Sequence, residues 1–262
     1  MRKQTTLAIE LARLEAEYTQ RDATNLYAQR YSYFNEAALL HIHSLERNLL
    51  ALLRRYTFTC LTTKKILDVG CGNGNHLRRF LDYGALPTNL SGIDLMKSRI
   101  EQARRLQPEI DWRVGSAHQL PYADKTFDLV TGFVVFSSIL DESLRQQIAD
   151  EMWRVRKPDG MIVVYDFTYA NPHNAAVQQV SRHTIKQLFD KPGACFDFYS
   201  VTLAPPVSRI LAPRVYWLAT ILEQCRLLNT HVLCAISSDA LRKQEGQGEK
   251  VKGVDEYVSM AK

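Results

Sequence analysis

The segment KILDVGCGNGNHLRRF, residues 65–80, decides the fold of this chain. Its first half is a short apolar run typical of a buried strand, and its second half has helical spacing. Between the two halves, glycines stand at positions 70, 72 and 74. A strand that ends in a glycine turn before a helix is typical of open parallel sheets, where ligands lie beyond the carboxyl ends of the strands. We therefore expect a binding site at residues 68–74.

The chain on both sides of this segment alternates in the same way. Strands are expected at 64–70, 89–95, 110–117, 127–136 and 160–167, with helices at 76–84, 96–106 and 141–157. Strands that alternate with helices predict an α/β fold with a doubly wound, mostly parallel sheet. Right-handed crossovers would place helices on both faces of that sheet.

Further elements flank this core. Helices are expected at 3–20, 35–56 and 181–189, and strands at 195–205 and 230–236, which bring the sheet to seven strands. An apolar helix interrupted by proline, 207–228, is expected to cover the sheet, with an interfacial membrane helix around Trp217 as the alternative. We predict an N-terminal helical lid or extension (1–58), a main domain (59–238) and a polar flexible tail (239–262).

The composition favours an ordinary globular protein. Of 262 residues, 46% are hydrophobic and 23% charged, and no apolar run is long enough to predict a membrane span. The N-terminus lacks the features of a signal peptide. Five scattered cysteines without a CxxC pair indicate a cytoplasmic location and argue against a disulfide framework or a metal site. The net charge of +5 is dispersed, so no nucleic-acid partner is expected.

The spacing of the glycines indicates the type of ligand. The dinucleotide fingerprint G-x-G-x-x-G would require a third glycine where Asn75 stands. The turn is instead preceded by Asp68, whose carboxylate would repel a pyrophosphate and attract an ammonium or sulfonium group. Asp94 ends the second strand, where an acid binds the ribose hydroxyls. Ser116 and Ala117 end the third strand, where an adenine edge would lie. Adenosine joined to a cationic amino acid describes S-adenosylmethionine.

Four segments carry a family resemblance. ILDVGCGNG (66–74), GIDL (92–95), GSAHQLPYADKTFDLV (115–130) and EMWRVRKPDGMIVVYDF (151–167) resemble the class I S-adenosylmethionine-dependent methyltransferases in order and spacing. LPYADKTFDLV and RKPDG look like the small-molecule branch, of methyltransferase type 11, that includes quinone and sterol methyltransferases. RYSYFNEAALL, FSSILDESLRQQIADEMWRV and YDFTYANPHN are similar to a bacterial group from surface-polysaccharide or secondary-metabolite clusters.

The resemblance implies S-adenosylmethionine as cofactor and S-adenosylhomocysteine as product. Ser116 departs from the pattern, because many members carry an acid at this position. The expected cofactor-binding residues line the ends of the first four strands: Asp68, Gly70, Cys71, Gly72, Asn73, Gly74, Asp94, Leu95, Met96, Ser116, Ala117 and Phe133.

The acceptor side is less constrained by the sequence. An aromatic cluster of Tyr31, Tyr33 and Phe34 is expected either to dock on the main domain or to close over the site as a lid. Ser137 and Ser138 would either orient the substrate or cap the next helix. Methyl transfer needs alignment of the reacting atoms and, for some acceptors, a base. The candidate bases are His183, His173, Asp166 and Tyr165.

We expect methyl transfer to a small molecule or glycan, with oxygen as the acceptor atom. The alternatives are a peptide carboxylate, a quinone-type ring carbon, and a non-catalytic scaffold that binds the cofactor. A nicotinamide dehydrogenase is disfavoured by Asn75 and Asp68.

Overall fold

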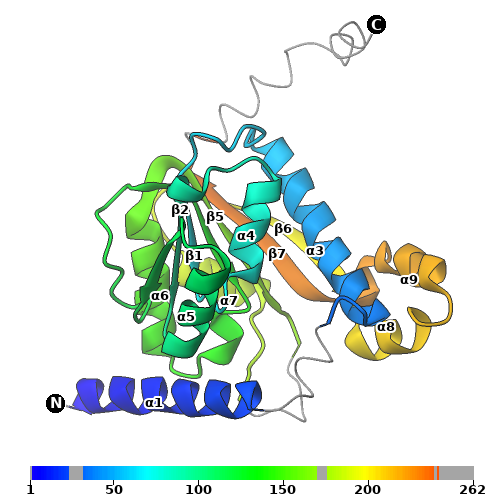
Figure 1. The fold of residues 1–262 in the computed structure, drawn as a ribbon, viewed down its shortest axis with the longest axis horizontal. Helices are drawn as coiled ribbons and strands as arrows, with labels where there is room; N and C mark the ends of the chain where they lie inside the picture. Colours follow the sequence, from blue (N-terminus) through cyan, green and yellow to red (C-terminus); the bar gives the residue numbers. More distant parts are fainter. Residues whose placement is uncertain (1, 24–31, 170–175, 239–240, 242–262) are drawn as a thin grey trace, which may run out of the picture.

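A seven-stranded sheet forms the centre of the computed structural model, which describes residues 2–23, 32–169, 176–238 and 241 (Figure 1). The strand order is β3-β2-β1-β4-β5-β7-β6. β7 is antiparallel to both of its neighbours, and the other pairs are parallel. The expected doubly wound, mostly parallel sheet is confirmed. Its strands are β1 Ile66–Val69, β2 Leu90–Asp94, β3 Asp111–Val114, β4 Phe127–Phe133, β5 Arg156–Phe167, β6 Ala194–Leu203 and β7 Asn229–Ser238.

Helices cover both faces of the sheet. One face packs against α3 (Glu36–Arg55), α4 (Asn75–Asp82) and α5 (Lys97–Leu106). The other face packs against α6 (Glu142–Val155) and α7 (Arg182–Leu188), and α1 (Arg2–Asp22) adds Leu14 to the same cluster. In Figure 1, α1 lies across one end of the strands. All four residues of β1 are buried, because a central parallel strand faces helices on both sides.

The fifth strand begins earlier than the sequence suggested. We expected a helix to residue 157 and a strand from 160, but α6 ends at Val155 and β5 begins at Arg156. The Arg156 guanidinium donates to the carbonyls of Lys157, Pro158 and Gly160, which holds this segment extended. A Cβ on Gly160 would lie 2.8 Å from the backbone oxygen of Asp128, so close packing requires glycine there.

The apolar segment between β6 and β7 is divided as expected at its central proline. It forms α8 (Pro205–Leu211), α9 (Tyr216–Glu223) and a 3-10 turn at Arg226–Leu228. Leu40 of α3, Leu203 of β6 and Ala219 of α9 share a small apolar cluster. The segment therefore covers the end of β6 with one side only, and it projects from the body of the molecule (Figure 1).

Trp112 of β3 fixes the shape of the glycine turn from below. The indole is buried, and its Nε1 donates to the carbonyl of Gln107 at 2.8 Å. A Cβ on Gly74 would lie 2.2 Å from this ring, and one on Gly92 would lie 2.6 Å from it. Gly74 also has a φ of +78°, so this position excludes a side chain for two independent reasons.

We predict that Gly74→Ala destabilises the protein more than Gly84→Ala does. Gly84 is a matched control, because its φ is +91° and a Cβ added there would meet nothing within 4 Å. Both variants carry the backbone penalty, and only the first forces Trp112 to move, which adds about 1–3 kcal/mol. Urea denaturation of both variants measures the difference. Equal losses would contradict the role of Trp112.

Candidate functional site

The turn between β1 and α4 is held against the end of β2. The backbone N–H groups of Gly70 and Cys71 both donate to the carbonyl of Ile93, at 2.8 and 3.1 Å. Gly70 and Gly72 have φ values of +68° and +55°, which glycine adopts without a Cβ penalty. The Cys71 side chain is buried, and burial raises the pKa of its thiol. Cys71 is therefore a packing residue whose backbone forms the turn.

Asp68 is a buried acid at the carboxyl end of β1. Its side chain is 1% exposed, and one carboxylate oxygen accepts a hydrogen bond from the Thr131 hydroxyl at 2.7 Å. Burial raises the pKa of Asp68 to about 7, and the nearby Asp94 adds to the shift. A carboxyl group whose pKa is raised toward 7 by desolvation is a common feature of functional sites. A cation bound beside it would favour its charged form.

Asp94 connects the end of β2 to the glycine turn and to the start of α5. Its two carboxylate oxygens accept from the backbone N–H groups of Gly72 and Met96, each at 2.8 Å. Burial raises the pKa of this carboxyl, and the two N–H groups oppose that shift. Each carboxylate oxygen has a further lone pair, so Asp94 is able to accept hydrogen bonds from a diol while it holds the turn.

The end of β3 lies beside Asp94. The Gly115 N–H donates to the Asp94 carbonyl at 2.9 Å, which places Ser116 and Ala117 next to the end of β2. The Ser116 hydroxyl lies 2.7 Å from Nδ1 of His118. Leu95 and Ala117 pack against the same apolar cluster. The sequence-predicted residues of β1, β2 and β3 are thus brought together at one edge of the sheet.

The end of β4 forms the other side of this edge. Phe133 stacks on His76, in the first turn of α4, with ring centroids 4.6 Å apart. Val134 has a φ of +58°, a strained conformation for a β-branched residue that is found mainly at functional sites. The Val135 side chain fills the space above Gly70, since a Cβ there would lie 2.9 Å from it.

The predicted bases do not converge on one point. Tyr165 lies on the face of the sheet that α3 covers, and its hydroxyl is 2.8 Å from that of Thr202 in β6. Asp166 is fully buried and accepts from the N–H groups of Ser137 and Phe167, and burial raises its pKa to about 6. His183 is exposed on α7, and His173 lies outside the described residues. Asp166 is placed to support the turn at 136–138.

The loop after β4 is anchored by α1. The Tyr18 hydroxyl donates to the Ser138 hydroxyl at 2.9 Å, and Arg13 donates to the Ser138 carbonyl at 2.6 Å. Glu10 accepts from the Leu140 N–H at 2.7 Å. At its other end, α1 pairs Asp22 with Arg99 of α5. This helix therefore spans from the end of β4 to the start of α5, across the carboxyl ends of the strands.

The two described residues of the predicted aromatic cluster, Tyr33 and Phe34, make no such contact with the loop after β4: Tyr33 contacts α4, and Phe34 faces solvent. The Tyr33 hydroxyl accepts from Arg79 on α4, and Phe34 is 96% exposed. Tyr31 lies outside the described residues. Sequence reasoning missed the roles of Tyr18, Thr131 and Trp112. The one available signal was the amphipathic pattern of α1, which did not show where that helix packs.

Comparison with known proteins identifies the domain that contains these strand ends. Residues 66–160 match the family described as a methyltransferase domain. This segment is a methyltransferase domain. The resemblance to class I S-adenosylmethionine-dependent methyltransferases is confirmed over its length.

Relatives with assigned names match parts of the chain. The demethylmenaquinone methyltransferase of Renibacterium salmoninarum is 30% identical over 106 residues, 40% of this chain and 42% of that protein. The demethylmenaquinone methyltransferase of Thermotoga maritima is 26% identical over 186 residues, 70% of this chain and 69% of that protein. Across three curated relatives, the chain spans 40–54% of their length.

A solved structure shows the same fold. The PH0226 protein from Pyrococcus horikoshii OT3 superposes with a TM-score of 0.54 and 19% identity, and the match covers 76% of this chain and 89% of that one. The methyltransferase domain of this chain thus continues into a complete sheet of known architecture.

We predict that Asp68→Asn stabilises the fold progressively more as pH rises from 5 to 8. The pKa of Asp68 is raised, so the folded protein retains a proton that the unfolded chain releases, and its stability falls as pH rises toward 7. Asparagine does not ionise, so the variant does not lose this free energy of unfolding, which is on the order of 1–4 kcal/mol. Urea denaturation at several pH values measures the gain.

The exposed acid Asp111, changed to asparagine, is the control for this measurement. A pH-independent difference between Asp68→Asn and the parent protein would show that Asp68 is ionised throughout the range.

Proposed function

We propose that this chain is an S-adenosylmethionine-dependent methyltransferase that acts on a small molecule. One observation carries the proposal: the glycine turn and two buried acids, Asp68 and Asp94, meet at adjacent strand ends within a methyltransferase domain. The acids suit the positive charges of this cofactor, and a pyrophosphate in the same place would be repelled.

The described residues fit the parts of S-adenosylmethionine. Asp94 would accept hydrogen bonds from the ribose hydroxyls, and Ser116 and Ala117 would border the adenine. Gly70 and Gly72 would allow the backbone to approach the amino-acid part of the cofactor closely. The Asp68 carboxylate would attract the ammonium group of that part. When bound, this cofactor supplies an electrophilic methyl group.

The protein contributes orientation and shelter to the reaction. Phe133 ends β4, and Val134 follows it, at the edge where the acceptor would approach. Asp166 holds the following turn through the Ser137 N–H. α1 spans this edge and is placed to exclude water. Alignment of donor and acceptor supplies much of the rate enhancement in such reactions.

We propose a quinone-type ring as the first acceptor class to test. The two relatives named above are methyltransferases of demethylmenaquinone, which favours the ring-carbon alternative over the oxygen acceptor expected from the sequence. A small cavity beside the end of β4 has a mixed lining of apolar, aromatic and charged side chains: Leu45, Glu46, Leu49, His76, Arg79, Tyr83 and Phe133. Transfer to oxygen, on a small molecule, glycan or peptide, stays a prediction.

The proposal is tested first by calorimetry with S-adenosylmethionine, S-adenosylhomocysteine and NAD. Binding of the first two without NAD supports the cofactor assignment. Methyl transfer from labelled cofactor to a reduced naphthoquinone and to a catechol then separates carbon from oxygen acceptors by the fragmentation of the product. Cofactor binding with no transfer to any acceptor would favour the scaffold alternative.

We predict that Asp94→Ala weakens S-adenosylmethionine binding more than tenfold. Two charge-assisted hydrogen bonds, each worth ~1.5–3 kcal/mol, would be lost with the carboxylate. Asp111→Ala removes an exposed acid of the neighbouring strand and is the matched control. Unchanged affinity in Asp94→Ala would remove this residue from the site.

We also predict that Tyr18→Ala lowers turnover about tenfold, because the loss of one anchoring contact of ~1.4 kcal/mol loosens α1 over the site. Thr19→Ala changes the next residue, whose hydroxyl donates to the Glu15 carbonyl within the helix, and should leave turnover unchanged. Steady-state kinetics measure both variants, with circular dichroism as a check on folding. Full activity of Tyr18→Ala would contradict a lid role for α1.

A further inference from the structure

The segment between β6 and β7 has one buried side and one exposed side. Ala219 and Glu223 of α9 are buried, and Glu223 forms an ion pair with Arg47 of α3 at 2.7 Å. His41 of α3 lies 2.8 Å from the Ser208 hydroxyl of α8. These contacts fix the two short helices on the end of α3 and leave their outer side free.

Large apolar side chains gather on the outer side. Trp217 and Ile221 are one helical turn apart on α9, so they share a face, and Trp217 is 65% exposed. Ile210 of α8 is also exposed, and Leu227 in the following turn is 89% exposed. In the described part of the chain, the other exposed large apolar residues are spread along the sequence between Ile9 and Tyr169, in helices, strands and loops.

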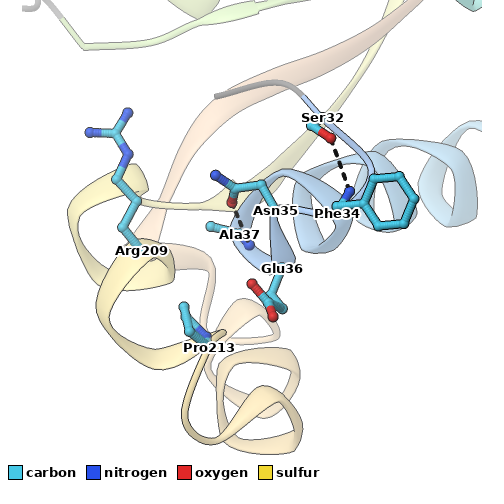
Figure 2. Close-up of a pocket in the computed structure, with 7 residues that line it drawn as sticks. All are labelled: Ser32, Phe34, Asn35, Glu36, Ala37, Arg209 and Pro213. Carbon is cyan, nitrogen blue, oxygen red and sulfur yellow. Dashed lines mark hydrogen bonds between the residues drawn. The ribbon is translucent and has the colours of Figure 1, made fainter. Parts of the chain in front are cut away.

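The exposed charges of the same segment are all positive. Arg209, Arg214 and Arg226 are exposed, and the single acid of residues 205–228 is the buried Glu223. Figure 2 shows the neighbouring cleft between the start of α3 and α8, where the Arg209 side chain extends away from Glu36. The exposed residues of the segment thus combine apolar and basic groups.

We infer that this α8–α9 surface docks on the anionic face of a lipid bilayer. The surface consists of Ile210, Trp217, Ile221 and Leu227 together with Arg209, Arg214 and Arg226. Interfacial helices place tryptophan and aliphatic side chains below the headgroups and arginines among the anionic headgroups. Among the described residues, no helix is long and apolar enough to cross a bilayer, so the contact is peripheral.

The shape and the charge of the surface favour a membrane over a protein partner. α8 and α9 project from the body (Figure 1), so their ends reach a flat surface before the rest of the molecule does. The arginines, at positions 209, 214 and 226, are interspersed among the apolar residues along the chain. A laterally uniform anionic surface accepts such dispersed charges, whereas a protein partner would need acids placed to match them.

Tryptophan fluorescence tests the inference directly. The chain has three tryptophans; Trp112 is buried, Trp153 is half-buried over Arg156, and only Trp217 is exposed. Vesicles of phosphatidylcholine with phosphatidylglycerol should shift the emission to the blue, and brominated lipids should quench it. Trp217→Phe should lose the shift while the protein still sediments with the vesicles.

Two further variants test the apolar and basic parts of the surface. Trp217→Ser with Ile221→Ser should lower sedimentation with anionic vesicles at least about tenfold, whereas Leu106→Ser, at an exposed site on α5, should not. Arg214→Gln with Arg226→Gln should weaken binding to anionic vesicles about tenfold, with Arg105→Gln as the control. Circular dichroism verifies that each variant is folded.

Three results would overturn the inference. They are the absence of binding to anionic vesicles, equal binding by Trp217→Ser with Ile221→Ser, and self-association that this double variant abolishes without any vesicle binding. The last would assign the surface to a second copy of the chain. None of these measurements uses a cofactor or an acceptor, so their outcome is independent of the proposed methyltransferase activity.

Discussion

Two carboxylates are kept out of water at adjacent strand ends, and the arrangement of the candidate site depends on this constraint. Asp94 retains its place because the N–H groups of Gly72 and Met96 bond to it. Those bonds in turn fix the glycine turn and the start of α5. Among the described residues, one hydroxyl, that of Thr131, donates to the Asp68 side chain, and burial raises the pKa of this carboxyl. The buried carboxyl group of Asp68 thus destabilises the fold when it is charged, and the same group is the part of the site best suited to bind a cation.

The packing around this edge removes alternatives for the backbone. Trp112 occupies the space that side chains at positions 74 and 92 would need, and Val135 does the same above Gly70. The glycines are therefore required by the packing of the protein core as well as by the proposed ligand site. A turn enclosed by rigid side chains has one conformation available, and a site that is already shaped loses little entropy when a ligand binds.

The proposed acceptor side is built from elements far apart in the sequence. α1 reaches the loop after β4 and the start of α5, and α3 packs beside α4 with Leu45 and Leu49 near Phe133. The α8–α9 surface lies at the far end of α3. Substrate selection in such a fold depends on these added elements, because the shared sheet supplies only the cofactor side.

The sequence by itself determined the strand–turn–helix unit at 65–80, the alternation that predicts the sheet, and the acids at positions 68 and 94. These are local patterns, set by apolar periodicity and by residues that follow a strand directly. Only the tertiary structure decided that α1 contacts the loop after β4, that Trp112 lies under the glycine turn, and that Trp217 faces outward. The physical reason is that the sequence of an amphipathic helix, or the presence of a large apolar ring, shows that apolar surface must be buried. It does not show which segment buries that surface, because this depends on contacts between residues far apart in the sequence.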